Sequence, residues 1–386
     1  MTQRLIHLVA STLEKPWDWT ALSANPCITQ QDIEDYPFIP WNWASASDNP
    51  NITLDYVFSV LKRRTECSSA QAEEHVFSVM KRRTECSSAQ QRNPDHDWNF
   101  ASLSSNPSLT IDHILDHSDK QWDWLKLSRH KNITWHHIQE YSHLPWNFAM
   151  VSANPNITMN TLLANSDILW SPFYLSYNPS ITLNDIRNNP TFPWDWHILS
   201  SDKVLEGLTA ADVTNPLLKW NISNLSANPS VTLDLIDQTP EIPWDYHRVS
   251  HNPNLTLTYV LKNSTKPWDW DIFPYSLPVH GSVHVLKNLA FWNKNTLNAR
   301  KLSYNASLTL VDVLENPNID WSWATLSSSL NLHDADLHHH KVCDWFWQSH
   351  PWFWPMLSAN KSLRLSMIDP VLPWDWVVLS GNTFQQ

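Results

Sequence analysis

Tryptophans, in many places paired two residues apart, return along almost the whole 386-residue chain, and most steps from one repeat to the next are 24 residues. The first tryptophans of the units are Trp17, Trp41, Trp98, Trp122, Trp146, Trp170, Trp194, Trp220, Trp244, Trp268, Trp292, Trp321, Trp352 and Trp374. A fixed period is the sequence signature of repeat architectures, in which each unit packs on its neighbours. The rhythm therefore predicts a single elongated repeat domain over residues 1–386, with no room for an independent globular domain.

Aligned on the tryptophans, the units share the consensus Pro-Trp-Asp-Trp, two variable residues, Leu-Ser, one residue, Asn-Pro, one residue and Ile-Thr-Leu. Proline is tolerated at the first position of a helix, and an aspartate there complements the positive end of the helix dipole. In the unit that begins at Pro243, we therefore expect the first helix to start at Pro243, Trp244 and Asp245. It ends within about two turns, because the residue before Pro253 is pushed out of the helical region.

A threonine after the Asn-Pro turn is placed to cap a second helix through its side-chain oxygen. The threonines are Thr29, Thr53, Thr110, Thr182, Thr232 and Thr309. Asp32, Asp185 and Asp312 lie three residues further on, as in a relative of the capping box. We expect second helices of about seven to nine residues, which are too short to be stable without packing on other units.

Tryptophans at positions i and i+2 of a helix point about 200° apart, so the first helix of each unit is held on two sides. We expect Trp196 and Leu199 to face the partner helix of their own unit, and Trp194 to pack on a neighbouring unit. Burying one indole contributes about 4–6 kcal/mol before the entropy cost is subtracted. The predicted fold is all-α: an α-solenoid of about 14 short helix pairs.

These features carry two resemblances. The 24-residue period, with Asn-Pro, a nearby threonine and apolar residues at helical spacing, resembles the leucine-rich repeat variant, which implies that one helix of each pair is 3₁₀ as an alternative to α. The segments PWDWTALSANPCIT from Pro16, PWDYHRVSHNPNLT from Pro243 and PWDWVVLSGNT from Pro373 resemble tandem Trp-Asp-Trp repeat proteins of giant DNA viruses that infect amoebae. This resemblance implies a place in the host cytoplasm or the virion, and it implies no activity.

Composition narrows the classes of partner. A net charge of −12 opposes nucleic acid and anionic membranes, since affinity for both rests on clustered lysine and arginine. The chain has no run of 18 apolar residues, so no membrane span is predicted. The start Met1-Thr2-Gln3-Arg4 lacks the features of a secretory signal. Four scattered cysteines predict reduced thiols. We therefore expect an intracellular protein that is not secreted and has no cofactor.

The rhythm breaks in an inserted duplicated segment, residues 57–92. VFSVLKRRTECSSAQ (57–71) returns as VFSVMKRRTECSSAQ (76–90), with fourteen of fifteen residues the same. Each copy carries a basic cluster in an otherwise acidic chain. The candidate partner-binding residues are Lys62, Arg63, Arg64, Lys81, Arg82 and Arg83. These clusters are interpreted as a solvated helix end with a polar loop, and docking on an acidic partner or a phosphate is the alternative.

A His-rich irregular segment covers residues 330–350. Its candidate metal ligands are His333, His338, His340 and Cys343, but their spacing matches no established metal motif, so no metal site is predicted. A polar surface loop and pH sensing through histidine are the alternatives. Residues 1–15 are predicted to cap the array at its N-terminus, and residues 377–386 to form its C-terminal end.

The pattern favours a non-enzymatic scaffold whose variable positions bind another protein, as a viral structural or host-interaction protein. A carbohydrate-binding repeat protein is the alternative, because exposed tryptophan beside aspartate and asparagine stacks on and hydrogen-bonds sugars. No catalytic residue is predicted. The recurring serines, such as Ser226 and Ser250, are interpreted as turn-forming residues, whereas a nucleophile would be unique.

Overall fold

The computed structural model describes residues 4–72, 97–201, 203–273, 299–305, 307–330, 332 and 352–384. Across these residues the chain is helical and contains no β-strand, so the predicted all-α repeat fold is confirmed. The chain divides into two compact units. Unit 1 comprises Met1–Ile133 with Trp354–Gln386, and unit 2 comprises Thr134–Phe353.

Both units consist of repeats, and each repeat is a pair of short helices, here called its first and second helix. In unit 1 these are α1 (Leu5–Ser11), α2 (Trp19–Ala24), α3 (Gln30–Asp35), α4 (Trp43–Ala46), α5 (Leu54–Ala72), α7 (Phe100–Leu103), α8 (Ile111–Asp116), α9 (Trp124–Ser128), α29 (Trp354–Ser358), the 3₁₀ helix η1 (Leu365–Met367) and α30 (Trp376–Ser380). First helices have four to seven residues, and second helices mostly have six. The first helices stay within the predicted two turns, whereas most second helices are shorter than the seven to nine residues predicted.

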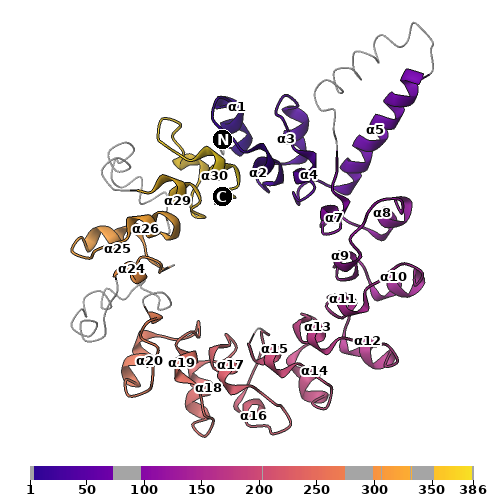
Figure 1. Ribbon diagram of the computed structural model, residues 1–386. Helices are drawn as coiled ribbons and strands as arrows, with labels where there is room; N and C mark the ends of the chain where they lie inside the picture. The colour runs from indigo at the N-terminus through magenta and orange to yellow at the C-terminus, as the bar shows by residue number, and fades with distance from the viewer. Residues whose placement is uncertain are drawn as a thin grey trace. The chain divides into compact units, whose positions relative to one another are not determined.

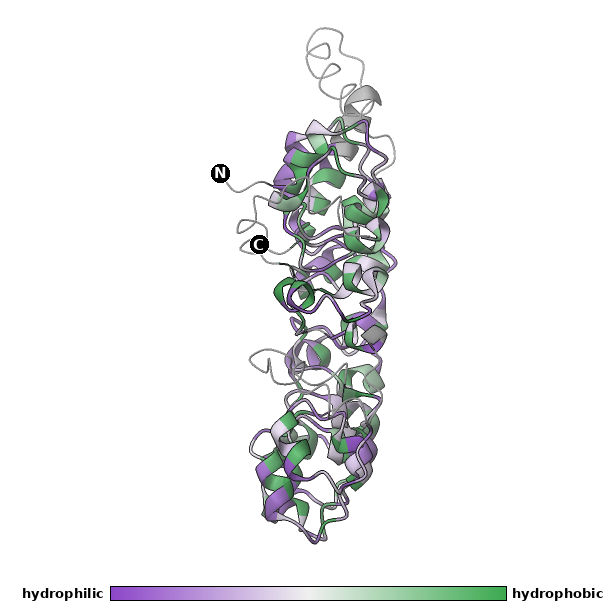
Figure 2. Cartoon of the chain, turned by 90° about the vertical axis from the view of Figure 1, so that its left-hand side faces the viewer, coloured by the Kyte–Doolittle hydropathy of each residue, from purple (hydrophilic) through white to green (hydrophobic). Residues whose placement is uncertain are grey.

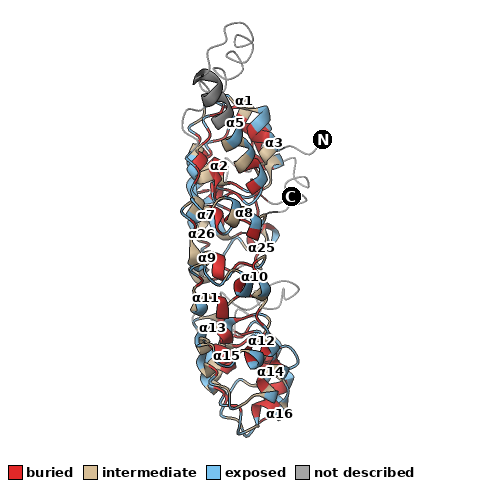
Figure 3. Cartoon of the chain, turned by 90° about the vertical axis from the view of Figure 1, so that its right-hand side faces the viewer, coloured by how far each residue is buried: buried red, intermediate tan, exposed pale blue. Residues whose placement is uncertain are grey.

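Unit 2 holds α10 (Trp135–Glu140), α11 (Phe148–Ser152), α12 (Met159–Ala164), α13 (Pro172–Tyr177), α14 (Leu183–Asn188), α15 (Trp196–Ser201), α16 (Ala210–Val213), α17 (Ile222–Ala227), α18 (Leu233–Gln238), α19 (Tyr246–Val249), α20 (Leu257–Lys262), α24 (Ala299–Leu302), α25 (Leu310–Glu315) and α26 (Trp323–Ser329). First helices α11, α13, α15 and α17 follow one another along one side, and second helices α12, α14, α16 and α18 along the other (Figure 1). Hydrophobic residues recur along the pairs (Figure 2), and each short helix mixes buried with exposed residues (Figure 3).

The residue between the two aromatic residues is the N-cap of the first helix. Asp245 has an extended backbone, its side chain accepts from the N–H of Arg248, and α19 begins only at Tyr246. The predicted helix start at Pro243 is therefore wrong, because aspartate is a better cap than a first-turn residue. The same cap is made by Asp18, Asn42, Asn99, Asp123, Asn147, Ser171, Asn221, Ser322 and Asp375.

Threonine caps the second helix as predicted. Thr29, Thr182 and Thr309 each accept from the N–H three residues on, and the aspartate at that position closes a capping box. The repeat at Trp352 tests the rule, because Arg364 replaces the threonine and makes no side-chain cap. The second helix is there reduced to the 3₁₀ helix η1, as expected when the first N–H groups lose their acceptor.

In most of the described repeats, the first tryptophan closes the helix before it. Trp194, which is 5% exposed, donates from Nε1 to the carbonyl of Asn189 at the end of α14 (2.9 Å). Trp196 lies edge-on against Trp220 of the next repeat, with ring centroids 5.2 Å apart. This contact differs from the predicted packing of Trp196 on the partner helix of its own repeat. Equivalent pairs, at 5.1–5.3 Å, are Trp43–Trp98, Phe100–Trp122, Tyr246–Trp268, Trp323–Trp352 and Trp354–Trp374.

A buried serine joins consecutive repeats. Ser226 Oγ accepts from the N–H of Asp245 in the next repeat (3.0 Å) and donates to the Ile222 carbonyl (2.7 Å). Other serines that accept from the next repeat, at 2.9–3.0 Å, are Ser23, Ser47, Ser104, Ser152, Ser176, Ser200, Ser250, Ser303, Ser327 and Ser358. These serines lie at the end of the first helix, where the sequence placed them, and they also join consecutive repeats.

The asparagine of Asn-Pro makes a dense set of hydrogen bonds in several joints, where a joint is the contact between consecutive repeats. Asn252 Nδ2 donates to the carbonyls of Ser226, Asn228 and Val231 at 3.0–3.2 Å, and its Oδ1 accepts from the Asn254 N–H. The carbonyls of Ser226 and Asn228 lie at the end of α17, where helical acceptors lack an intrahelical partner. Asn49 and Asn178 donate to three carbonyls of their preceding repeats in the same way.

Two repeats replace this asparagine with a titratable residue. His130 Nε2 lies 3.0 Å from the Asn106 carbonyl, and its Nδ1 accepts from the Asn132 N–H, so the ring copies both functions of the amide. Lys203 is 8% exposed and donates to the Asn178 carbonyl. Burial lowers the pKa of Lys203 to about 8, against the opposing charge of Asp185.

Unit 1 brings the two ends of the sequence together, because α30 packs on α2 (Figure 1). The sequence predicted residues 1–15 as an N-terminal cap and 377–386 as the C-terminal end. The described part of the first segment holds α1, tied to the first repeat by Arg4 and Asp32, whose charged groups lie 2.6 Å apart. The described part of the second segment, residues 377–384, contacts the first repeat through Asn25 and Cys27.

Replacing the joint asparagine should destabilise the array. We expect Asn252→Ala to cost about 2–4 kcal/mol of unfolding free energy, because several buried backbone groups lose their partner. Chemical denaturation followed by circular dichroism measures the loss. Asn160→Ala, an exposed position of α12, is the matched control and should stay within about 0.5 kcal/mol of wild type. Equal effects of the two changes would contradict the role given to the joint asparagine.

Acid should loosen the joint at His130. Burial lowers the pKa of His130, with the Asn106 carbonyl opposing the shift. The unfolded chain therefore binds the proton more readily, and the contribution to stability is lost as pH falls from the ordinary histidine value of about 6.5 towards the folded value. Asparagine does not titrate, so the denaturation midpoint of His130→Asn should not share this loss. We expect its midpoint to rise relative to that of wild type as pH falls from about 7.5 to about 5. Parallel pH profiles for the two proteins would rule this out.

Candidate protein-interaction site

Helix α5 departs most from the repeat pattern among the described second helices. It runs from Leu54 to Ala72, 19 residues, whereas its neighbours α3 and α8 have six each. Figure 1 shows it extending well past the ends of both neighbours. The first copy of the duplicated segment, residues 57–71, therefore lies within this helix.

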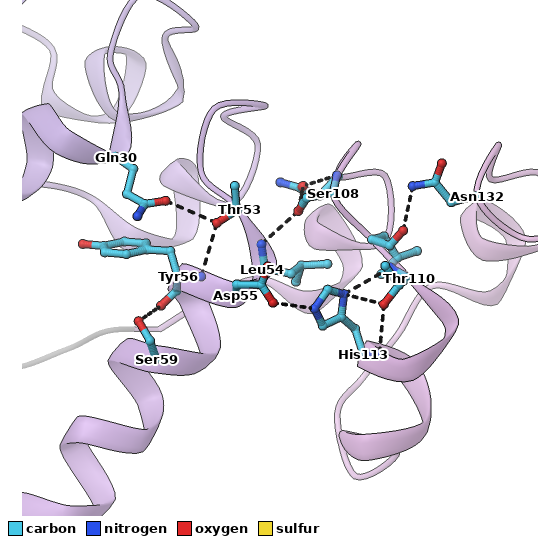
Figure 4. Close-up of polar contacts among 12 residues, drawn as sticks. Gln30, Thr53, Leu54, Asp55, Tyr56, Ser59, Ser108, Thr110, His113 and Asn132 are labelled. Atoms are coloured by element: carbon cyan, nitrogen blue, oxygen red, sulfur yellow. Dashed lines mark hydrogen bonds and ion pairs between the residues drawn. The ribbon is translucent and has the colours of Figure 1, made fainter.

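The start of α5 is fixed to the repeats on both sides. Thr53 Oγ1 accepts from the Tyr56 N–H at 3.3 Å and donates to Gln30 Oε1 of the preceding repeat at 3.2 Å. The Leu54 N–H donates to Ser108 Oγ of the following repeat at 2.9 Å. Figure 4 shows these contacts converging on the first turn of the helix. The base of α5 is thus held like any second helix.

Aromatic and ionic contacts with α8 extend this anchorage by one more turn. His113 Nδ1 accepts from the Thr110 N–H, so its Nε2 carries the hydrogen that faces Asp55, 3.1 Å away (Figure 4). The ring of Phe58 stacks on His117 with centroids 3.6 Å apart and planes 7° from parallel. The face of α5 that turns towards α8 is therefore occupied.

Burial keeps two groups at this base uncharged near neutral pH. It raises the pKa of Tyr56 to about 12, and the carboxylate of Glu34 adds to the rise while Arg63 opposes it. Burial also lowers the pKa of His117, although the charges of Asp116 and Asp119 oppose the shift. Tyr56 and His117 therefore add packing to the anchorage and no charge near neutral pH.

The predicted basic residues of the first copy lie just beyond this base. Lys62 and Arg63 are both exposed. The guanidinium of Arg63 lies 4.0 Å from Glu34 and donates to the Ser59 carbonyl at 3.3 Å. A surface ion pair of this kind is worth about 0–1 kcal/mol, so it is readily exchanged for another carboxylate. Arg64 belongs to α5, but its side chain lies outside the described residues.

The other candidate residues lie outside the described residues: Lys81, Arg82 and Arg83 of the second copy, and His333, His338, His340 and Cys343 of the His-rich segment. Within the described parts of the chain, no three histidine, cysteine or acidic side chains are grouped so as to hold a metal ion.

The tryptophans face inward wherever the structure describes them. Each of these rings is buried or half-buried, and none is exposed. The carbohydrate alternative required exposed tryptophans, and the described residues offer none. The recurring serines, such as Ser226, have their hydroxyl proton on a helix carbonyl rather than on a base.

Phe58, His113 and His117 were not singled out from the sequence. Phe58 belongs to the duplicated segment, but nothing in the spacing of His113 and His117 shows that α8 meets α5 there. Such a contact depends on how neighbouring second helices pack.

Comparison with known proteins does not connect this chain with a family. No protein-family model matches the chain, and searches of curated proteins and of solved structures give no significant match. Among the described helices, none combines the length and the apolar character that a bilayer crossing requires.

The stack on Phe58 should set the titration of His117. Because burial lowers this pKa, we expect Phe58→Ala to move it up towards the ordinary histidine value of about 6.5. An NMR titration of the histidine side chains measures both proteins. The same pKa for His117 in both would show that the contact with α5 does not bury the ring in solution.

Proposed function

We propose that this protein is a non-enzymatic repeat scaffold, and that α5 is its docking arm for an acidic surface of another protein. The observation that carries the proposal is the length of α5, which leaves its second half beyond the helices that anchor its base. An array that needs only a second helix has no use for the additional turns.

The consensus residues support a scaffold because their side chains make contacts between repeats within the chain. The serine, the asparagine and the two aromatic positions all bond or pack within joints, as Ser226, Asn252 and Trp196 do. Variation between repeats is therefore left to exposed positions. Large apolar examples are Leu125, Phe173, Tyr177, Met356 and Val377.

Charge supports an acidic partner. The chain carries a net charge of −12, which disfavours association with acidic surfaces in general, yet Lys62 and Arg63 stand exposed on α5. A local cluster of this kind steers an acidic partner to one place on an otherwise repelling surface. The resemblance to giant-virus repeat proteins supports a viral structural or host-interaction role for this chain.

Charge reversal on α5 tests this proposal. Wild type, Lys62→Glu/Arg63→Glu and the control Arg248→Glu/Lys262→Glu, which alters two exposed cations elsewhere, serve as baits in quantitative pull-downs. A protein retained by wild type is then purified, and its binding is measured by calorimetry. We expect the α5 variant to weaken binding by about tenfold or more, and the control to change it by less than about threefold.

High salt should reduce the affinity of wild type towards that of the α5 variant, because exposed charge pairs are screened. A partner that binds both variants equally, or whose affinity does not depend on salt, would refute α5 as the docking arm.

A further inference from the structure

The joint between the repeat at Trp374 and the repeat at Trp17, here called the terminal joint, lies within unit 1. Trp376 meets Trp17 edge-on with centroids 5.1 Å apart, the same separation as in the Trp43–Trp98 pair. Lys15 Nζ lies 5.5 Å from the centre of the Trp376 ring. The equivalent lysine of another joint, Lys120, covers Phe100 at 5.8 Å.

The polar contacts of the terminal joint are also those of an ordinary joint. Ser380 Oγ accepts from the Asp18 N–H at 2.9 Å. Asn25 Nδ2 donates to the carbonyls of Ser380 and Asn382 at 2.8 and 2.9 Å. These bonds copy those that Asn252 makes to Ser226 and Asn228, although the partners are here more than 350 residues apart in sequence.

Cys27 completes the set. Its Sγ lies 3.2 Å from the Thr383 carbonyl. In other joints, asparagine at this position donates to the equivalent carbonyl, as Asn132 does to Pro107 and Asn254 does to Pro229. A thiol is a weaker donor than an amide, so this contact is the least strongly held of its kind.

One difference sets the terminal joint apart. Consecutive repeats are connected by the chain itself, whereas the last and first repeats are held by non-covalent contacts alone. Opening this joint uncovers the rings of Trp17 and Trp376, each only 5% exposed when it is closed. The uncovered faces keep the hydrogen-bond pattern of a joint, so the surface that complements the first repeat is the C-terminal repeat of this sequence.

We propose that the terminal joint is exchangeable and that a second copy of this chain can occupy it, so that two copies trade their C-terminal repeats. Within one chain the two faces meet at an effective concentration on the order of millimolar. The closed monomer therefore dominates in dilute solution, and exchange becomes populated as the protein concentration approaches that range. Such exchange of an identical element is a low-cost route to a dimer.

Two cysteine variants test the exchange. In both, Cys67, Cys86 and Cys343 are replaced by Ser. One copy keeps Cys27 and Thr383, and the other carries Cys27→Ser with Thr383→Cys at an exposed position. The two are incubated together at about 0.5 mM, diluted and treated with a short bismaleimide. We expect a covalent heterodimer of twice the 44.9 kDa chain mass.

The matched control moves the second cysteine to the exposed position Asn160, which lies in unit 2 and not at the joint. It should give at least about tenfold less heterodimer, since only random collisions link it. Equal yields, or no heterodimer from the joint pair, would overturn the proposal. A single chain with both Cys27 and Thr383→Cys should link internally, and failure to do so would show that the terminal joint is not closed in solution.

Discussion

Everything in this fold depends on the hydrogen bonds that a buried asparagine or serine makes across each joint. Helices of four to seven residues are too short to persist alone, and each ends with carbonyls that lack an intrahelical partner. The amide of Asn252 satisfies such carbonyls in the preceding repeat, and Ser226 holds the N-cap backbone of the following one. Indole packing contributes area, while these polar contacts set the register between repeats.

The same joint explains how the protein treats its exceptions. His130 replaces the amide with a ring that donates and accepts at the same two places, and it introduces a pKa that burial depresses. Arg364 replaces a capping threonine, and the second helix shrinks to a 3₁₀ turn. At the terminal joint the pattern needs no chain connection, because Ser380 and Asp18 meet as in any other pair of repeats. A joint therefore forms wherever two repeats present matching contacts, even if their sequences differ or the chain does not connect them directly.

Function, by contrast, is expected where the pattern is left behind. Lys62 and Arg63 could be singled out from the sequence because they form a basic cluster in an acidic chain. The stacking of Phe58 on His117 could not, since it requires α5 to pack beside α8. The base of α5 follows the rules of the array, and its remaining turns obey no constraint of the joints. That freedom is the reason why we propose this helix as the docking arm.

The sequence by itself determined the period, the helix pair and the threonine caps, because these depend on hydrogen bonds between residues two to four positions apart. It misplaced the start of the first helix at Pro243, since the choice of Asp245 as cap is a competition between two local solutions. Tertiary structure alone decided that Trp196 packs on the next repeat and that Asn25 bonds to Ser380. Repeats present alike faces, so spacing along the chain cannot tell which face meets which; only packing in space does.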